Sequence, residues 1–181
     1  MTRHPTRVAP GDLSAVLWAL LAASAREDAT AFIALLDEAD EQLAESTDPH
    51  WTAWRHALTA RRSLLDDAPD AAVVDVAAAR EALDKCPPSA DTALLMAFLA
   101  HGEVLADHFD AAMLLAVDAS LLTEGAAATE PSRALLQAHR WLSLALSGLD
   151  LEEPAVSHAM RGQHVAAALR EPADQWRMRL L

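Results

Sequence analysis

The sequence lacks the residues that cross-link a chain or bind metals in pairs. Cys86 is the only cysteine, so an internal disulfide is excluded, and this fits the reducing cytoplasm, where we expect the protein to reside. No two of the eight histidines lie three or four residues apart, which excludes the helical spacing of a zinc site. We therefore expect no metal and no cofactor.

Catalytic motifs are also missing, since the chain has neither a glycine-rich phosphate loop nor a serine in a G-x-S-x-G turn. Asp37 and Glu41 share one helix face, but acid–base catalysis needs a desolvated carboxyl, and the sequence favours a solvated face. Cys86 has Lys85 beside it and no base, so we interpret it as a small packing residue. We expect no enzymatic activity within these residues.

Positive charge is scarce. The 181 residues include 14 Lys and Arg against 27 Asp and Glu, which gives a formal net charge of −13. Nucleic-acid binding relies on neutralising phosphates with Lys and Arg, so we expect no nucleic-acid partner. The same charge disfavours an anionic membrane surface, and no apolar run reaches the roughly 20 residues that span a bilayer. We expect no membrane association.

The residues that strands prefer are few, whereas alanine and leucine favour helix and five glycines leave few breaks. We therefore predict an all-α chain, in which proline, glycine and aspartate separate eight helices and a ninth begins after Pro172. The eight predicted ranges are 12–26, 28–46, 50–66, 69–85, 89–106, 109–124, 131–148 and 152–170. Residues 1–11 are expected to be a flexible amino-terminal segment, and residues 12–181 a single helical-repeat domain.

Alanines recur at intervals of forty residues. Ala39, Ala79 and Ala119 lie in three stretches that each open on an aspartate suited to cap a helix. Such a period is typical of helical repeats. The stretches read as the second helices of helix pairs, and short links within pairs predict antiparallel neighbours. We interpret the alanines as points of close approach between stacked helices. In the fourth pair the register drifts to Gly162, where forty residues would give Ala159.

The third predicted pair carries a family resemblance. Its large and small residues fall where the tetratricopeptide repeat places its packing residues, at Met96, Leu99, Ala100, Phe109, Ala112 and Ala119. The chain resembles that family over about residues 50–170, although its period exceeds the family's usual length of roughly 34 residues. The resemblance implies a right-handed solenoid of eight or nine helices in antiparallel pairs. The first helices of such pairs line a concave groove that binds extended peptides or partner helices.

Arginines form the candidate binding site. Arg55 and Arg62 lie seven residues apart on one first helix, and Arg133 and Arg140 have the same spacing on another. In a tetratricopeptide-like groove the four would form a positive strip suited to an acidic peptide or ligand. The alternative is that they pair with neighbouring acidic residues. The remaining groove candidates on first helices are His101, His139 and Trp51, the last of which is also a candidate for core packing.

The carboxyl end stops inside a predicted helix with four apolar side chains uncovered: Trp176, Met178, Leu180 and Leu181. We interpret the chain as a piece of a longer protein, and the alternative is that a partner subunit covers these residues in a homodimer. The segment 135–146 is similar to the amino-terminal repeat regions of actinobacterial multidomain signalling proteins, such as GGDEF diguanylate cyclases. That resemblance implies an output domain beyond Leu181.

These observations predict a non-catalytic interaction or regulatory module. It would bind a partner chain or itself and control an attached output domain. The alternative is a sensor, in which the groove closes over a small molecule or peptide and shifts an equilibrium between two states. An enzyme that uses groove histidines and arginines is the third and least favoured class.

Overall fold

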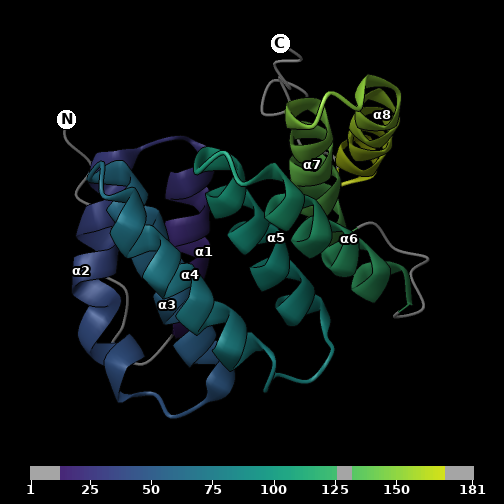
Figure 1. Cartoon of the computed structure of the whole chain (residues 1–181). Helices are drawn as coiled ribbons and strands as arrows, with labels where there is room; N and C mark the ends of the chain where they lie inside the picture. Colours follow the sequence, from purple (N-terminus) through teal and green to yellow (C-terminus); the bar gives the residue numbers. More distant parts are fainter. Residues whose placement is uncertain (1–12, 126–131, 170–181) are drawn as a thin grey trace, which may run out of the picture.

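In the computed structural model, the described residues are 13–125 and 132–169, and they form eight helices and no strand (Figure 1). The helices are α1 (Leu13–Ala25), α2 (Ala29–Glu45), α3 (Pro49–Leu65), α4 (Pro69–Leu83), α5 (Ala90–Leu105), α6 (Phe109–Gly125), α7 (Arg133–Gly148) and α8 (Glu152–Ala168). The all-α prediction is confirmed, and every predicted boundary lies within two residues of the observed one. The ninth helix and the amino-terminal segment fall outside the described residues. No helix in the described part of the chain is long and apolar enough to cross a bilayer.

Local capping explains where many of these helices begin. Four helices start after a side chain that accepts a hydrogen bond from a backbone N–H of the first turn, which would otherwise lack a partner. The caps are Asp28 for α2, Asp48 for α3, Ser89 for α5 and Ser132 for α7. Pro49 and Pro69 open α3 and α4, where the missing N–H of proline costs least.

One type of turn joins the two helices of every pair. An acidic residue in the left-handed region closes each turn, with φ between 57° and 59°: Glu27, Asp67, Asp107 and Asp150. The N–H of the next residue donates to the carbonyl five residues back at 2.8 to 3.0 Å in all four turns, which is the Schellman ending of a helix. A negative charge at this place also lies just before the amino terminus of the second helix, where it is favourable.

The buried small residues keep a fixed distance from these turns. Ala39, Ala79, Ala119 and Gly162 each lie twelve residues after the acidic residue of their turn, and all four are buried. The fourth pair therefore keeps the same internal register. The apparent drift to Gly162 is corrected: Ser132 lies three residues further from Ala119 than Ser89 lies from Ala79, and this insertion shifts the whole fourth pair along the sequence.

Helix α5 lies at the centre of the arrangement. It packs against α3, α4, α6 and α7, and nine of its sixteen residues are buried. Its sequence is apolar nearly all round between Ala93 and Ala100, and a helix of this kind has to be enclosed. Helix α7 packs against α5, α6 and α8, whereas α4 touches α5 only slightly. Figure 1 shows α2 and α8 at opposite ends of the molecule, with α1 behind the layer of α3, α4 and α5.

A close approach of α6 to α7 depends on a glycine. A Cβ added to Gly148 would lie 2.5 Å from the ring of Phe109, the first residue of α6. The ring therefore rests on the backbone at the end of α7. Any larger residue at position 148 would push the two helices apart.

Candidate ligand-binding site

A row of aromatic rings crosses the molecule from α3 through α5 to α7. Fully buried Trp54 lies with its ring centroid 5.5 Å from that of Phe98, and Phe98 meets His101 edge-on at 6.3 Å. His101 then stacks on Trp141 with the ring centroids 3.8 Å apart and the planes within 8°. The indole N–H of Trp54 donates to His50 at 3.2 Å, so its polar edge is satisfied. The row thus joins the first helices of three consecutive pairs.

Two arginines reach the end of this row. The guanidinium of Arg140 lies 4.6 Å from the centre of the Trp141 ring, within cation–π distance. Arg61 of α3 is only 9% exposed, and its Nε has no hydrogen-bond partner among the described residues. A buried donor without a partner costs about 1–3 kcal/mol, so the position of Arg61 needs an explanation.

Both arginines act on His101. Burial, followed by the positive charges of Arg61 and Arg140, holds the pKa of His101 well below its usual range. The imidazole is therefore neutral at pH 7 and presents one donor and one acceptor nitrogen. His101 and Arg140 both lie against the ring of Trp141, and Arg61 opposes protonation of the same imidazole, so side chains of α3, α5 and α7 contribute to one site. We call Arg61, His101, Arg140 and Trp141 the inner arginine site.

Glu27 is the acidic residue that acts on both guanidiniums. Burial lowers the pKa of Arg61 and of Arg140, and the attraction of Glu27 partly opposes that change in each. The side chain of Arg61 has no hydrogen bond or ion pair within the described ranges, with Glu27 or any other residue. Within the described residues, the carboxylate of Glu27 thus attracts both guanidiniums without a hydrogen bond to Arg61.

The register of the turns explains why these residues meet. Arg61 and His101 each lie six residues before the acidic residue of their turn, so they occupy equivalent positions of neighbouring helix pairs. Phe98 and Trp141 are likewise equivalent, at nine residues before theirs. Trp18 has this same position on α1, and the guanidinium of Arg133 lies 5.3 Å from its ring centre. The side chain of Arg133 thus links α7 to α1 beside the site.

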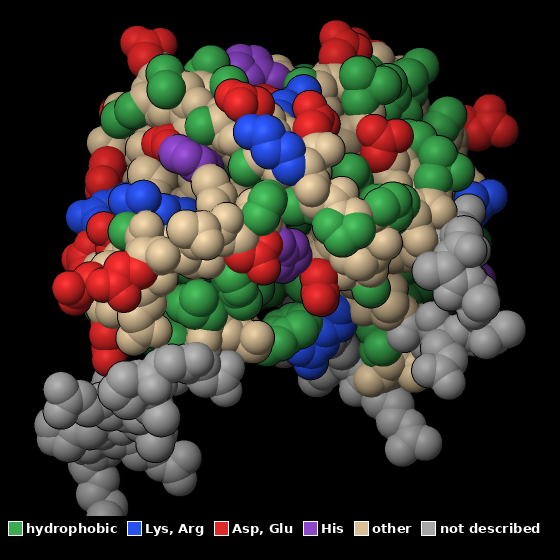
Figure 2. Space-filling model, turned by 90° about the horizontal axis from the view of Figure 1, so that it is seen from below, with side chains coloured by type: hydrophobic (Ala, Val, Ile, Leu, Met, Phe, Trp, Pro, Cys, Tyr) green, Lys and Arg blue, Asp and Glu red, His purple; other side chains and the backbone are tan. Residues whose placement is uncertain are grey.

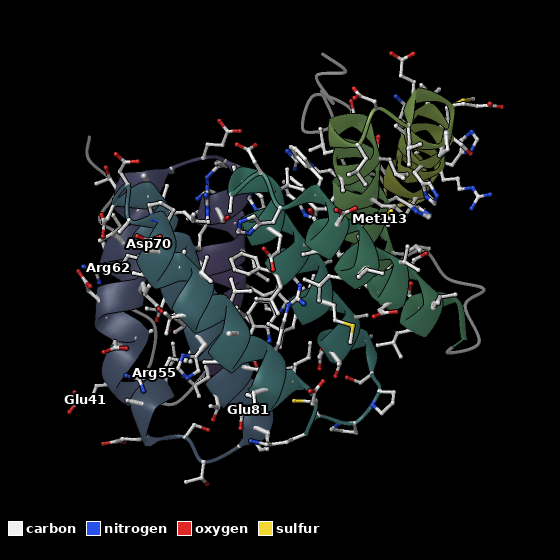
Figure 3. The ribbon with its side chains drawn as sticks, viewed as in Figure 1. Glu41, Arg55, Arg62, Asp70, Glu81 and Met113 are labelled. Atoms are coloured by element: carbon white, nitrogen blue, oxygen red, sulfur yellow. The ribbon has the colours of Figure 1, made fainter. Side chains whose placement is uncertain are left out.

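The structure does not bring the four predicted arginines into one strip. Arg55 donates to Asp40 at 3.4 Å and Arg62 donates to Asp37, so both pair with acidic residues of α2, as the alternative interpretation predicts. Figure 3 shows Arg55 and Arg62 beside α2, at the opposite end of the molecule from α7.

The reason is a difference in register. Counted back from the acidic residue of their own turns, Arg55 and Arg62 lie five residues closer to the turn than Arg133 and Arg140. Five residues correspond to roughly 140° around a helix, so the two pairs point to different faces. The seven-residue spacing within each pair of arginines therefore does not show whether the two pairs lie on the same face of the helical stack.

The other predicted groove residues lie apart from the inner arginine site. His139 is buried, with its Nδ1 3.3 Å from that of His158 on α8. Trp51 is partly exposed and packs edge-on against His50. The predicted dimer or partner contacts, namely Trp176, Met178, Leu180 and Leu181, lie outside the described residues. Within the described ranges, no group of three or more His, Cys, Asp or Glu side chains is placed to hold a metal.

A concave region lies away from this site, where the end of α4 meets α5 and α6. It is an open depression of about 400 Å³ with an apolar floor and two acidic residues, lined by Leu83, Asp84, Cys86, Pro88, Thr92, Met96, Asp118, Leu121 and Leu122. Burial, and then the charge of Asp48, raises the pKa of the Cys86 thiol, which favours the unreactive protonated form. Acidic side chains are widely spread over the face seen in Figure 2, with fewer Lys and Arg among them.

Sequence reasoning missed Arg61. It lies next to Arg62, yet a one-residue step turns a side chain by about 100° around the helix, from the face towards α2 to the interior. Alignment of the pairs on their turn residues, Asp67 and Asp107, would have placed Arg61 and His101 at the same position. That alignment was the available signal.

Comparison of the chain with protein-family models, with curated proteins and with solved structures finds no match, so the inner arginine site is interpreted from its own geometry.

Proposed function

We propose that this chain is a non-catalytic binding module whose recognition surface is built by the first helices of its pairs, α1, α3, α5 and α7. The observation that carries the proposal is the convergence of Arg61 and Arg140 on a neutral imidazole, with Arg61 lacking a hydrogen-bond partner in the described structure. Buried polar groups are normally satisfied, so an unsatisfied guanidinium suits an external acidic partner.

The chemistry of the site favours binding over catalysis. A histidine acts as a general base most effectively when its pKa lies near the working pH. His101 is a much weaker base than that because burial and two cations oppose its protonation. Both charged groups that shift its pKa are cations, whereas a catalytic histidine is commonly oriented by a carboxylate.

We further propose that the helix pairs form a right-handed, tetratricopeptide-like stack. The support is the repetition of one turn geometry at intervals of forty, forty and forty-three residues, together with a buried small residue twelve positions after each turn. Repeat units of one geometry that pack on their neighbours generate a superhelix with a continuous inner surface. On that surface, the module would bind an acidic segment of a partner chain or of a second copy and regulate an attached output domain.

A ligand sensor is the second candidate. The partly enclosed position of the inner arginine site favours it, because an enclosed pair of cations accommodates a small acidic molecule more readily than an extended chain. In this case, ligand binding would stabilise one conformation of the helical stack and shift its population.

A thermal-shift screen with acidic, neutral and basic peptides tests the module. We expect acidic peptides alone to raise the melting temperature of the wild type and of Arg55→Met, and to have less effect on Arg61→Met and Arg140→Met. Stabilisation by peptides of every charge, or by none while light scattering finds a monomer at all concentrations, would overturn the interaction module. Stabilisation by small acids only would favour the sensor.

A further inference from the structure

We infer that an apolar, acidic groove between α4 and α6 binds the segment 175–181 of a second copy of this chain. The groove lies on the side of the second helices of the pairs, away from the inner arginine site, so the inference goes beyond the proposed function. Three features of the molecule support it: the open junction between two helix pairs, the apolar face of α6 and the charge of the groove.

The junction between the second and third helix pairs is open on the side of their second helices. Helix α6 packs closely on α7, whereas α4 touches α5 only slightly. The depression of about 400 Å³ therefore remains between the end of α4 and α6, with Thr92 and Met96 of α5 in its lining. Figure 1 shows α5 between these two helices. An opening of this kind admits large apolar side chains of a partner segment.

Helix α6 carries an apolar stripe on its exposed face. Leu114, Val117 and Leu121 lie three and four residues apart, so they share one face of the helix, and all three are exposed. Leu121 also lines the depression, so the stripe and the depression form one continuous surface. We call this surface the outer groove. A contiguous exposed apolar surface marks an interaction site, which a single exposed apolar residue does not.

The stripe is specific to the third helix pair. Counted from the acidic residue of the turn, its members lie at positions seven, ten and fourteen, and these positions are exposed in all four second helices. None of the other three second helices has large apolar residues at more than one of them. The equivalents are Ala34, Asp37 and Glu41 in α2, Val74, Ala77 and Glu81 in α4, and Ser157, Met160 and His164 in α8. The repeat itself therefore does not require an apolar stripe, and a partner explains it.

Two aspartates make the outer groove acidic. Asp84 and Asp118 line the depression, and neither side chain forms an ion pair with another residue of the described ranges. Lys85, which follows Asp84, pairs with Glu81 at 3.1 Å. A segment with arginine or lysine beside large apolar residues would complement this surface in both charge and hydrophobicity.

The segment 175–181 has this chemistry. It reads Gln-Trp-Arg-Met-Arg-Leu-Leu, with four large apolar residues, two arginines and no acidic residue, in a chain of net charge −13. We assign the segment to a second copy because α8, which precedes it, packs only on α7 among the described helices and not on the helices of the outer groove. Two copies that exchange their segments would form a closed, symmetric dimer.

Sedimentation equilibrium of the full chain tests the inference by charge reversal. We expect the wild type to self-associate. Asp84→Arg/Asp118→Arg and Arg177→Asp/Arg179→Asp should each raise the dissociation constant about tenfold or more, because like charges then face one another. The two sets of changes combined should return the dissociation constant to within about threefold of the wild type, since opposite charges face one another again.

Two matched controls separate the outer groove from general effects. Glu38→Arg/Glu41→Arg makes the same change of charge on the exposed face of α2 and should leave the dissociation constant unchanged. Leu121→Ser should weaken association, whereas Met160→Ser on α8 should not. The two side chains are 59% and 55% exposed, so neither change removes a buried core residue.

A labelled peptide of residues 170–181 keeps the test decisive if a groove variant does not fold, because the peptide is added to the folded wild type. Fluorescence anisotropy should show binding at concentrations at which the chain is monomeric. The same peptide with Arg177→Asp/Arg179→Asp should bind about tenfold more weakly.

Four results would overturn the inference. They are a monomer at all concentrations, a combined variant that associates no better than either set alone, equal weakening by Glu38→Arg/Glu41→Arg, and equal binding of the two peptides. Failure of the inference is separable from failure of the proposed function, because the two surfaces differ. A monomer that acidic peptides stabilise would retain the binding module and reject the exchange of segments.

Discussion

Two clusters of buried charge in this molecule differ in how completely their members are satisfied. At the end of α5, Glu103 is only 7% exposed, and both of its carboxylate oxygens have partners, Arg80 at 3.0 Å and His108 at 3.0 Å. In the inner arginine site, two cations converge without a carboxylate bonded to Arg61. We call the Glu103 cluster closed because both oxygens of its carboxylate are bonded. We call the inner arginine site open because the Nε of Arg61 has no acceptor among the described residues.

The difference separates a structural role from a binding role. Breaking a buried ion pair leaves an uncompensated charge, so a satisfied cluster contributes to the cohesion of the elements that it joins. The Glu103 cluster joins α4, α5 and the turn before α6. Arg80 also has a buried Nε without a partner in the described residues, but the Nη2 of the same guanidinium donates to Glu103. At the inner arginine site, the Nε of Arg61 has no such bond within the described residues, and an acidic group of a partner would compensate for its burial.

We expect the largest change in the free energy of unfolding when the closed cluster loses Glu103. Glu103→Ala leaves Arg80 and His108 without their shared carboxylate and should lower the free energy of unfolding by about 2–3 kcal/mol, somewhat less than for a fully buried pair because both partners are partly exposed. Urea denaturation measures the change. A loss below about 0.5 kcal/mol would mean that the cluster is not structural, and the comparison would fail.

Arg61→Met should have the opposite sign. Replacing a buried cation that lacks a partner with an apolar side chain of similar length should leave the free energy of unfolding unchanged or raise it by about 1–2 kcal/mol in chloride buffer. The same urea experiment, repeated with an acidic peptide that raises the melting temperature of the wild type, should show more stabilisation of the wild type than of the variant. If Arg61→Met loses stability as Glu103→Ala does, then Arg61 is held by the protein and the two clusters are alike.

The pH dependence of stability should reveal the lowered pKa of His101. Its pKa in the folded chain lies well below the unfolded value of about 6.5, so the unfolded state binds a proton that the folded state excludes. Stability should therefore decrease as pH falls below about 6.5, by up to about 1.4 kcal/mol per pH unit. His101→Phe keeps a stacking ring, and the difference between wild type and variant isolates this residue from the carboxylates.

The charged groups around His101 set the sign of that difference. Arg61 on α3 and Arg140 on α7 oppose protonation, while Glu27 acts on both arginines from the turn before α2. The stability of His101→Phe relative to the wild type should thus increase between pH 7 and pH 5.5. An unchanged or reversed difference would show that the imidazole is not enclosed by cations, and the open cluster would lose its central member.

The helices were predictable from the sequence because their causes are local. Caps such as Ser89 and Ser132, first-turn prolines and the composition of α5 each act within one helix, and the observed boundaries follow them. The closed cluster was not predictable, since Arg80 and Glu103 are separated by 23 positions and only packing makes them neighbours. An acidic residue near the end of a largely apolar helix gives no sign of its partner.

The candidate site was found only in part for a different reason. Of the predicted groove residues, His101 and Arg140 lie together against Trp141 in the structure, whereas Arg55 and Arg62 pair with acidic residues of α2. Spacing within a helix defines a face but not the neighbour that the face meets. That neighbour depends on the register between pairs, which the turn residues mark and the alanine period marks less clearly.

The smallest expected effect concerns Arg55, and it sharpens the assignment of the site. The ion pair of Arg55 with Asp40 has an N–O distance of 3.4 Å, and the two side chains are 39% and 56% exposed. Exposed pairs of this kind contribute about 0.2–1 kcal/mol, so Arg55→Met should change the free energy of unfolding by less than about 1 kcal/mol. Stabilisation by acidic peptides should not change at all, because Arg55 and Arg61 lie on different faces of the helix. If Arg55→Met weakens this stabilisation as much as Arg61→Met, the peptide is attracted by the overall field of the arginines, and no single cluster binds it.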